Sequence, residues 1–151
     1  MSLRKSAFLM KLVALVFGIY ALLWATAPFP NINLPARFIL DVSDWPVDNL
    51  SVPLDRNTQW LVSIASGLLA ALAVLLAFVV APAIKRGDKN TVRATIYALI
   101  VWYVVDGIGS ISAGVVSNVF FNTIYLGLAL APLVPRVRWK LTSLAASVRK
   151  S

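Results

Sequence analysis

Residues 60–82 read WLVSIASGLLAALAVLLAFVVAP, a run of 23 residues without a charged side chain. A helix rises about 1.5 Å per residue, so this run would be about 35 Å long, enough to cross the apolar core of a bilayer. A chain in lipid must satisfy its own backbone hydrogen bonds, and the strand-like alternation of a β-barrel is absent. The run therefore predicts a transmembrane helix.

Three further stretches have the same character. They are residues 7–27 (AFLMKLVALVFGIYALLWATA), 94–112 (ATIYALIVWYVVDGIGSIS) and 115–134 (VVSNVFFNTIYLGLALAPLV). Together with 60–82 they predict an all-α fold, a four-helix transmembrane bundle that makes residues 1–151 a single membrane domain. The composition agrees, because 60% of the residues are hydrophobic and only 13% are charged. In a typical soluble domain about 45–50% of the residues are apolar and about 25% are charged.

The distribution of charge predicts the orientation. The formal net charge is +8, from 14 Lys and Arg residues against six Asp. Four spans place the N-terminus, the 83–93 loop and the tail on one side of the membrane, and that side holds twelve of the 14 cations. The other side holds only Arg37 and Arg56, together with four of the six acids. Since cations collect on the cytoplasmic side, both termini are predicted inside, and the charge is read as an orientation signal rather than as nucleic-acid binding.

Two segments outside the spans have patterns of their own. In the outer loop, 28–57, Pro35 would open a short interfacial helix with Phe38, Ile39, Val42 and Trp45 on its apolar face, and Pro46 would end it. An extended segment in which Leu50, Val52 and Leu54 alternate would follow. This loop is either a lid over the bundle or a surface that docks a partner. The basic tail, 135–151, has apolar residues at helical spacing and predicts an amphipathic helix on the anionic inner leaflet, as an anchor or a partner contact.

The composition removes most chemistry. The chain has no Cys and no His, and all its acids are Asp. Thiolate sites, the usual zinc sites, His-ligated haem and Ser-His or Cys-His nucleophile pairs are therefore excluded. No catalytic residue, metal site or cofactor is predicted, and contact with a lipid or a quinone stays open.

Asp106 is the one acid inside a predicted span, and an intramembrane carboxylate is a functional candidate by default. It lies 13 residues after Arg93, about 20 Å toward the outer face. A hairpin that turns near 112–114 brings it level with Asn118 or Asn122, which share one helix face. Ser110 lies one turn above Asp106, and Tyr103 lies one turn below, so these five residues predict a polar cluster.

Three interpretations of this cluster stay open. The Asp and Asn side chains would hold the helix hairpin together, or the third helix would end near Asp106 and leave it at the interface. In the third interpretation the cluster is a ligand or proton site, where a dry carboxyl carries a proton and a wet one binds a cation or a polar group.

Two stretches, LPARFILDVSDWPVD in the outer loop and VVDGIGSISAGVVSNVFFN across the last hairpin, resemble small bacterial four-helix membrane proteins. The general layout is also similar to that of DoxX-like proteins. This resemblance implies a four-helix bundle in a bacterial cytoplasmic membrane; it implies no reaction, and it assigns no functional residues.

The expected function is that of a non-catalytic accessory or structural membrane protein, a small subunit of a larger membrane complex. Its expected partners are membrane lipids and other membrane subunits, with no nucleic acid. The rival is a small oligomeric transporter, channel or ligand-binding protein that uses Asp106, Asn118 and Asn122. The partner complex, the ligand and the oligomeric state cannot be read from the sequence.

Overall fold

The computed structural model describes residues 1–133, and the predicted helix in the tail, 135–151, lies outside the described residues. Helices make up the regular structure of the described part, which contains no strand. They are α1 (Leu3–Trp24), α2 (Leu34–Ser43), α3 (Arg56–Leu75), the π-helix η1 (Leu76–Val80), α4 (Ala81–Arg86), α5 (Lys89–Ser112) and α6 (Val116–Leu130). The all-α prediction is confirmed for this part of the chain.

Three of the helices are long and apolar enough to cross a membrane, as expected of an integral membrane protein. They are α1, the continuous helix from α3 through η1 to α4, and α5. The sequence predicted a fourth span over 115–134. The apolar helix of this region is α6, which has 15 residues and is shorter than the three candidate spans, so a fourth span is not confirmed.

Polar side chains begin the three long helices. Ser2 accepts a hydrogen bond from the Lys5 amide before α1, and Asp55 accepts from two amides at the start of α3. Asp88 does the same for Asn90 and Thr91 at the start of α5. Each cap satisfies backbone N–H groups that have no partner within the helix, which fixes where the helix begins.

The Asp88 cap makes the stability of the protein depend on pH. Hydrogen bonds from the Thr91 hydroxyl and amide hold the pKa of the Asp88 carboxyl below its ordinary value. Stabilisation by a carboxyl whose pKa is lowered on folding is present above the unfolded pKa and is lost as the pH falls through the folded one. We therefore expect the advantage of the native chain over Asp88→Asn in thermal midpoint to shrink from pH 6 to pH 2. An advantage that stays constant over this range would contradict the prediction.

The second long helix contains a wide turn where a proline interrupts it. Pro82 has no amide hydrogen, and in a regular helix its ring would clash with the carbonyl four residues back. The preceding turn is a π-helix, in which the Ala81 amide donates to the Leu76 carbonyl. This wider turn accommodates Pro82, and α4 then ends at Gly87, whose φ of 76° is in the left-handed region that favours glycine.

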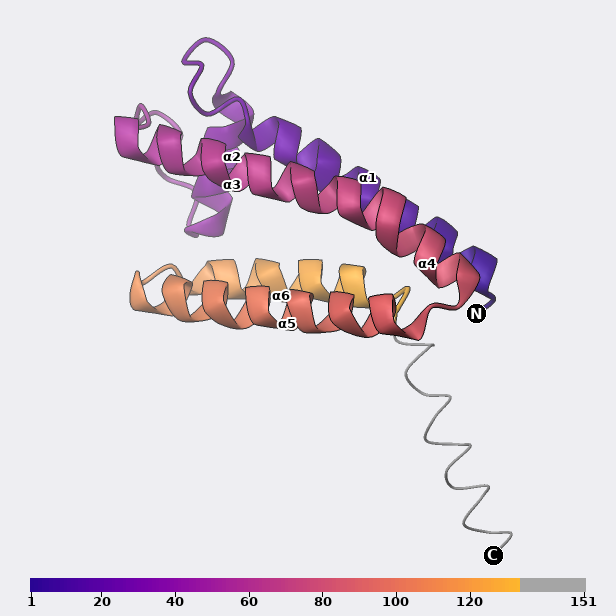
Figure 1. Cartoon of the computed structure of the whole chain (residues 1–151). Helices are drawn as coiled ribbons and strands as arrows, with labels where there is room; N and C mark the ends of the chain where they lie inside the picture. The colour runs from indigo at the N-terminus through magenta and orange to yellow at the C-terminus, as the bar shows by residue number, and fades with distance from the viewer. Residues whose placement is uncertain (134–151) are drawn as a thin grey trace, which may run out of the picture.

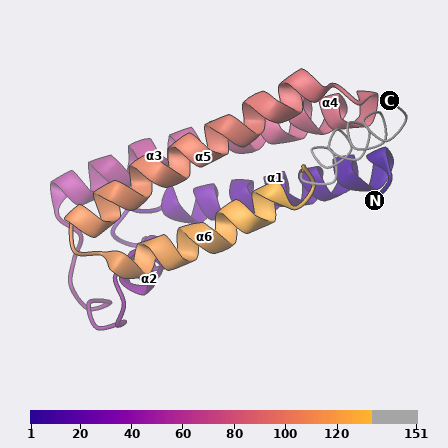
Figure 2. The same ribbon diagram turned by 90° about the horizontal axis from the view of Figure 1, so that it is seen from below.

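The three long helices and α6 form two antiparallel pairs, α1 with α3–α4 and α5 with α6 (Figure 1). The buried face of α1 repeats every three or four residues, the spacing of one side of a helix, at Ala7, Met10, Ala14, Phe17 and Ala21. These side chains pack on the second long helix. Figure 1 shows α5 and α6 below that pair, and Figure 2, seen from below, shows them in front of it. Leu99, Ala129 and Leu133 complete the core there.

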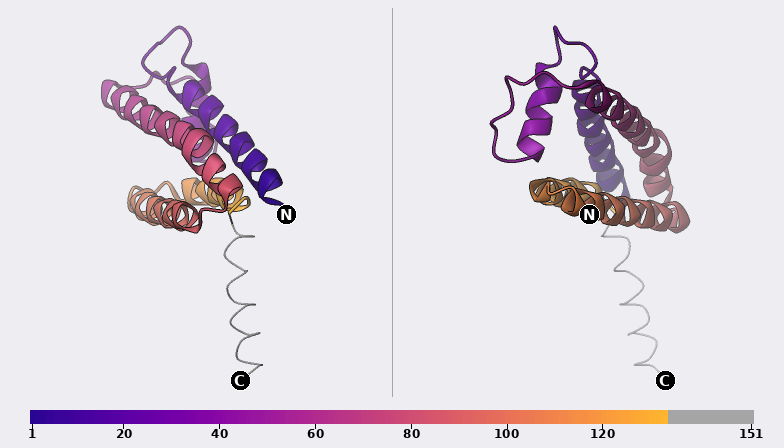
Figure 3. Two further views of the ribbon diagram at one scale, coloured as in Figure 1. Left: turned by 45° about the vertical axis from the view of Figure 1, so that its right-hand side comes forward. Right: turned by 90° about the vertical axis from the view of Figure 1, so that its left-hand side faces the viewer.

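Helix α2 lies at the end of the molecule where α1 ends and where α5 turns into α6 (Figure 3). The predicted outer helix is therefore present, although it ends at Ser43 rather than at Pro46. The structure shows turns and irregular backbone over 44–55, including residues 50–54, which the sequence predicted to be extended. The N-terminus, the α4–α5 turn and the end of α6 all lie at the opposite end (Figure 1).

Candidate functional site

The structure brings Asp106 together with both predicted asparagines. Asp106 lies on α5, which continues six residues further to Ser112, so the helix does not end at the acid. The Asp106 Oδ2 atom accepts hydrogen bonds from the Asn118 amide, at 3.2 Å, and from the Asn122 amide. Asn122 is buried, whereas Asp106 and Asn118 are half-buried. The carboxylate thus joins the two helices of the hairpin.

The remaining predicted residues divide between two contacts. Ser110 belongs to the cluster, because its hydroxyl accepts a hydrogen bond of 2.8 Å from the Asn118 amide. The Tyr103 hydroxyl instead bonds to the Thr123 hydroxyl, also at 2.8 Å, one turn closer to the other end of the hairpin. The structure therefore has two separate interhelical polar contacts where the sequence suggested one cluster.

The position of the turn explains these pairs. Gly114, with a φ of 84°, lies between α5 and α6 in a conformation that residues with a side chain rarely adopt. Asp106 and Asn122 are each eight residues from this glycine, and Ser110 and Asn118 are each four residues from it. In an antiparallel hairpin, residues equally far from the turn lie at the same level, so the turn determines which polar groups meet.

A cavity of about 910 Å³ adjoins the cluster. Asp106, Ser110 and Asn118 line one of its walls, while α2, the 49–55 segment and the start of α3 form the others. The cavity is bordered by four acidic side chains and one basic side chain. The acids are Asp41, Asp44, Asp55 and Asp106, and the base is Arg37. The charged side chains around this cavity are therefore mainly acidic, while apolar side chains such as Leu40, Val52 and Leu54 line much of the rest.

The sequence did not single out Asp41. Its side chain holds the irregular backbone of residues 44–55, called the outer segment below. This side chain is only 5% exposed, and its carboxylate accepts hydrogen bonds from the backbone amides of Asp48 and Asn49. The signal for such a role was weak. An irregular segment that returns along a helix has free N–H groups, and an acid near the end of that helix can satisfy them.

Ser117 was also missed, and it connects α2 to the hairpin. Its hydroxyl donates to the Ser43 carbonyl, at 2.6 Å, and accepts from the Trp45 amide, at 3.1 Å. This pair of bonds satisfies backbone groups just at and after the end of α2. No local pattern indicates a contact between residues more than seventy positions apart, so only the fold could reveal it.

Among residues 1–133, no group of three or more acidic side chains is arranged to hold a metal ion. Comparison of the chain with protein-family models, with curated proteins and with solved structures finds no match. The function must therefore be argued from the geometry of the chain itself.

Proposed function

We propose that this chain is a non-catalytic accessory or structural protein of a membrane, a small subunit of a larger membrane complex. The observation that supports this proposal is the exposure of α5. In the most apolar 18-residue stretch of α5, only 17% of the stretch is buried, whereas 39% of the corresponding stretch of α1 is buried. Tyr97, Val101, Val105 and Ile108 recur at helical spacing on one exposed stripe, which offers a broad apolar face to other membrane helices.

We propose further that α6 is the fourth span, with both termini in the cytoplasm of a bacterial cell. Helix α6 runs antiparallel to α5 over a length of about 22 Å, which local thinning of the bilayer can accommodate. The end of the molecule with the N-terminus and the α4–α5 turn carries Arg4, Lys5, Lys85 and Arg86. The positive-inside rule assigns that end to the cytoplasm.

The accessory proposal is tested by purification in a mild detergent with an affinity tag. We expect stoichiometric partners, and we expect Ile108→Trp to release them because a bulky side chain obstructs the α5 stripe. Leu68→Trp is the matched control, since Leu68 on α3 is 68% exposed and Ile108 is 62% exposed. Recovery of the native chain alone, or equal loss of partners in both variants, would overturn the proposal.

A second candidate function is favoured by the cavity beside Asp106. A small oligomeric transporter, channel or ligand-binding protein could use the carboxylate there, with Asn118 and Asn122 holding it in place. Asp106→Asn keeps an oxygen acceptor and removes the charge. If this candidate is right, the variant in proteoliposomes loses proton or cation flux, or ligand binding, while it stays folded. Unchanged activity in that variant would eliminate the carboxylate from any such role.

A further inference from the structure

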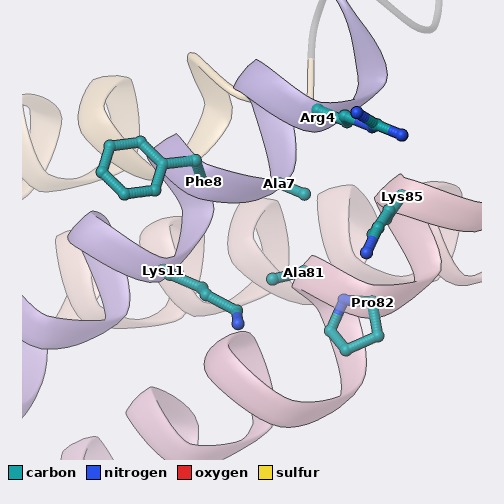
Figure 4. Close-up of a pocket in the computed structure, with 7 residues that line it drawn as sticks. All are labelled: Arg4, Ala7, Phe8, Lys11, Ala81, Pro82 and Lys85. Carbon is teal, nitrogen blue, oxygen red and sulfur yellow. The ribbon is translucent and has the colours of Figure 1, made fainter.

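A second cavity, of about 500 Å³, lies at the opposite end of the molecule, between the start of α1 and α4. Seven residues line it, namely Arg4, Ala7, Phe8, Lys11, Ala81, Pro82 and Lys85. Figure 4 shows the ammonium groups of Lys11 and Lys85 pointing toward Ala81 and Pro82, with Arg4 on the same side as Lys85. The Phe8 ring extends from the other side of α1 in that view.

Two features of the sequence bring the three cations together: the spacing of Arg4 and Lys11 on α1, and the small residues between α1 and α4. Arg4 and Lys11 are seven residues apart, which is almost two full turns, so they share one face of α1. Ala7 and Ala81 are buried, and their small side chains allow α1 and α4 to pack closely. Lys85 then projects from α4 over the same space as the two cations of α1.

These three cations have no counter-charge within the described part of the chain. None of them forms an ion pair with a carboxylate of residues 1–133. The acid between α4 and α5 is Asp88, and its carboxylate is occupied by the Asn90 and Thr91 groups that it caps. Three unpaired positive charges around one cavity repel each other, and a bound anion relieves that repulsion.

The position along the helix indicates which anion fits. Lys11 is eight residues beyond the first residue of α1 and four residues, about 6 Å, into the predicted span 7–27, where a lysine reaches toward the headgroups. The Phe8 side chain beside the cavity is 63% exposed, and Leu15 continues the exposed apolar surface deeper along α1. The site thus combines cations at headgroup level with an apolar wall that can accept an acyl chain.

We propose that this cavity binds the headgroup phosphate of an anionic phospholipid. A free phosphate ion carries a similar negative charge, but it has no acyl chain to cover the apolar wall. It would also lose part of its hydration beside Pro82 without that compensation. Basic pockets between membrane helices on the cytoplasmic side are suited to such headgroups. The inference goes beyond the proposed function, because it needs insertion in a membrane but neither a protein partner nor Asp106.

The test is a titration of the detergent-solubilised chain with phosphatidylglycerol, followed by native mass spectrometry. We expect saturable binding of one lipid. Each cation close to an anionic headgroup strengthens binding about fivefold, so Arg4→Gln/Lys11→Gln/Lys85→Gln should weaken it about 100-fold. The matched control is Lys5→Gln/Arg86→Gln/Arg93→Gln, which removes the same charge from the same end outside the cavity and should weaken binding clearly less than the cavity variant, because charge interactions fall off with distance.

Three results would overturn the proposal. They are equal weakening in both triple variants, equal binding of phosphatidylcholine by the native chain, and equal protection of its thermal midpoint by inorganic phosphate alone. The three side chains are exposed, so folding should survive, and an unchanged thermal midpoint without lipid verifies this. If the triple variant does not fold, Lys11→Gln alone should weaken binding about fivefold and Lys11→Arg should restore it.

Discussion

Asp106→Ala is expected to unfold more readily than Asp106→Asn, by about 1–2 kcal/mol. Both substitutions remove the carboxylate charge, so the cost of a charge within the span cancels between them. The asparagine keeps an oxygen that can accept from Asn118 and Asn122, whereas the alanine leaves both amides without this acceptor. The free energy of unfolding is measured by denaturant titration in mixed micelles.

A double-mutant cycle between Asp106→Ala and Asn122→Ala gives the control. Because the two side chains bond directly, we expect a coupling energy of about 1 kcal/mol. The same cycle between Asp106→Ala and Thr123→Ala should show additive effects, since Thr123 bonds to Tyr103 instead. Additivity in the first cycle would mean that the carboxylate does not hold the hairpin together.

Asp41→Ala should destabilise the outer segment by about 2–3 kcal/mol. The carboxylate is buried and accepts from the Asp48 and Asn49 amides, so its removal leaves these two backbone donors without their acceptor. We expect the hydrogen exchange of these two amides to accelerate. Since Asp41 and Asn49 both line the outer cavity, we also expect that cavity to lose its fixed shape.

The control for Asp41 is Asp44→Ala, on the same stretch of chain. Asp44 is exposed, and no side-chain hydrogen bond holds it to the 48–49 segment. Its replacement should leave exchange at Asp48 and Asn49 within about twofold of the native rate, as is usual for a surface substitution. Equal acceleration in both variants would show that the outer segment responds to loss of charge and not to loss of the Asp41 acceptor.

The long helices could be predicted because each is a local property of the sequence. Residues 60–82 carry no charge and are mostly apolar, and Asp55 stands where a capping acid is needed, so this helix could be located from its own residues. The fourth span was harder to predict, because apolar content over 115–134 does not reveal where the helix ends. In the structure α6 begins at Val116 and ends at Leu130.

The contacts of Asp106 within the α5–α6 hairpin could be predicted from the sequence, whereas the partner of Tyr103 could not. A turn near Gly114 fixes the register of an antiparallel hairpin, so the pairing of Asp106 with Asn122 and of Ser110 with Asn118 follows from counting residues. Tyr103 was placed with Asp106 because it lies one turn below on the same helix. The structure pairs it with Thr123, whose hydroxyl is closer across the hairpin.

The sequence by itself determined the helical class, the candidate membrane spans and the segregation of charge, because hydropathy and charge are summed over neighbouring residues. Only the tertiary structure decided that Asp41 is buried, that Ser117 holds the end of α2, and that Arg4, Lys11 and Lys85 share one cavity. These contacts join residues far apart in the chain. They depend on how closely the small side chains of α1 and α4 allow two helices to approach, and on where a returning loop finds its hydrogen-bond acceptors.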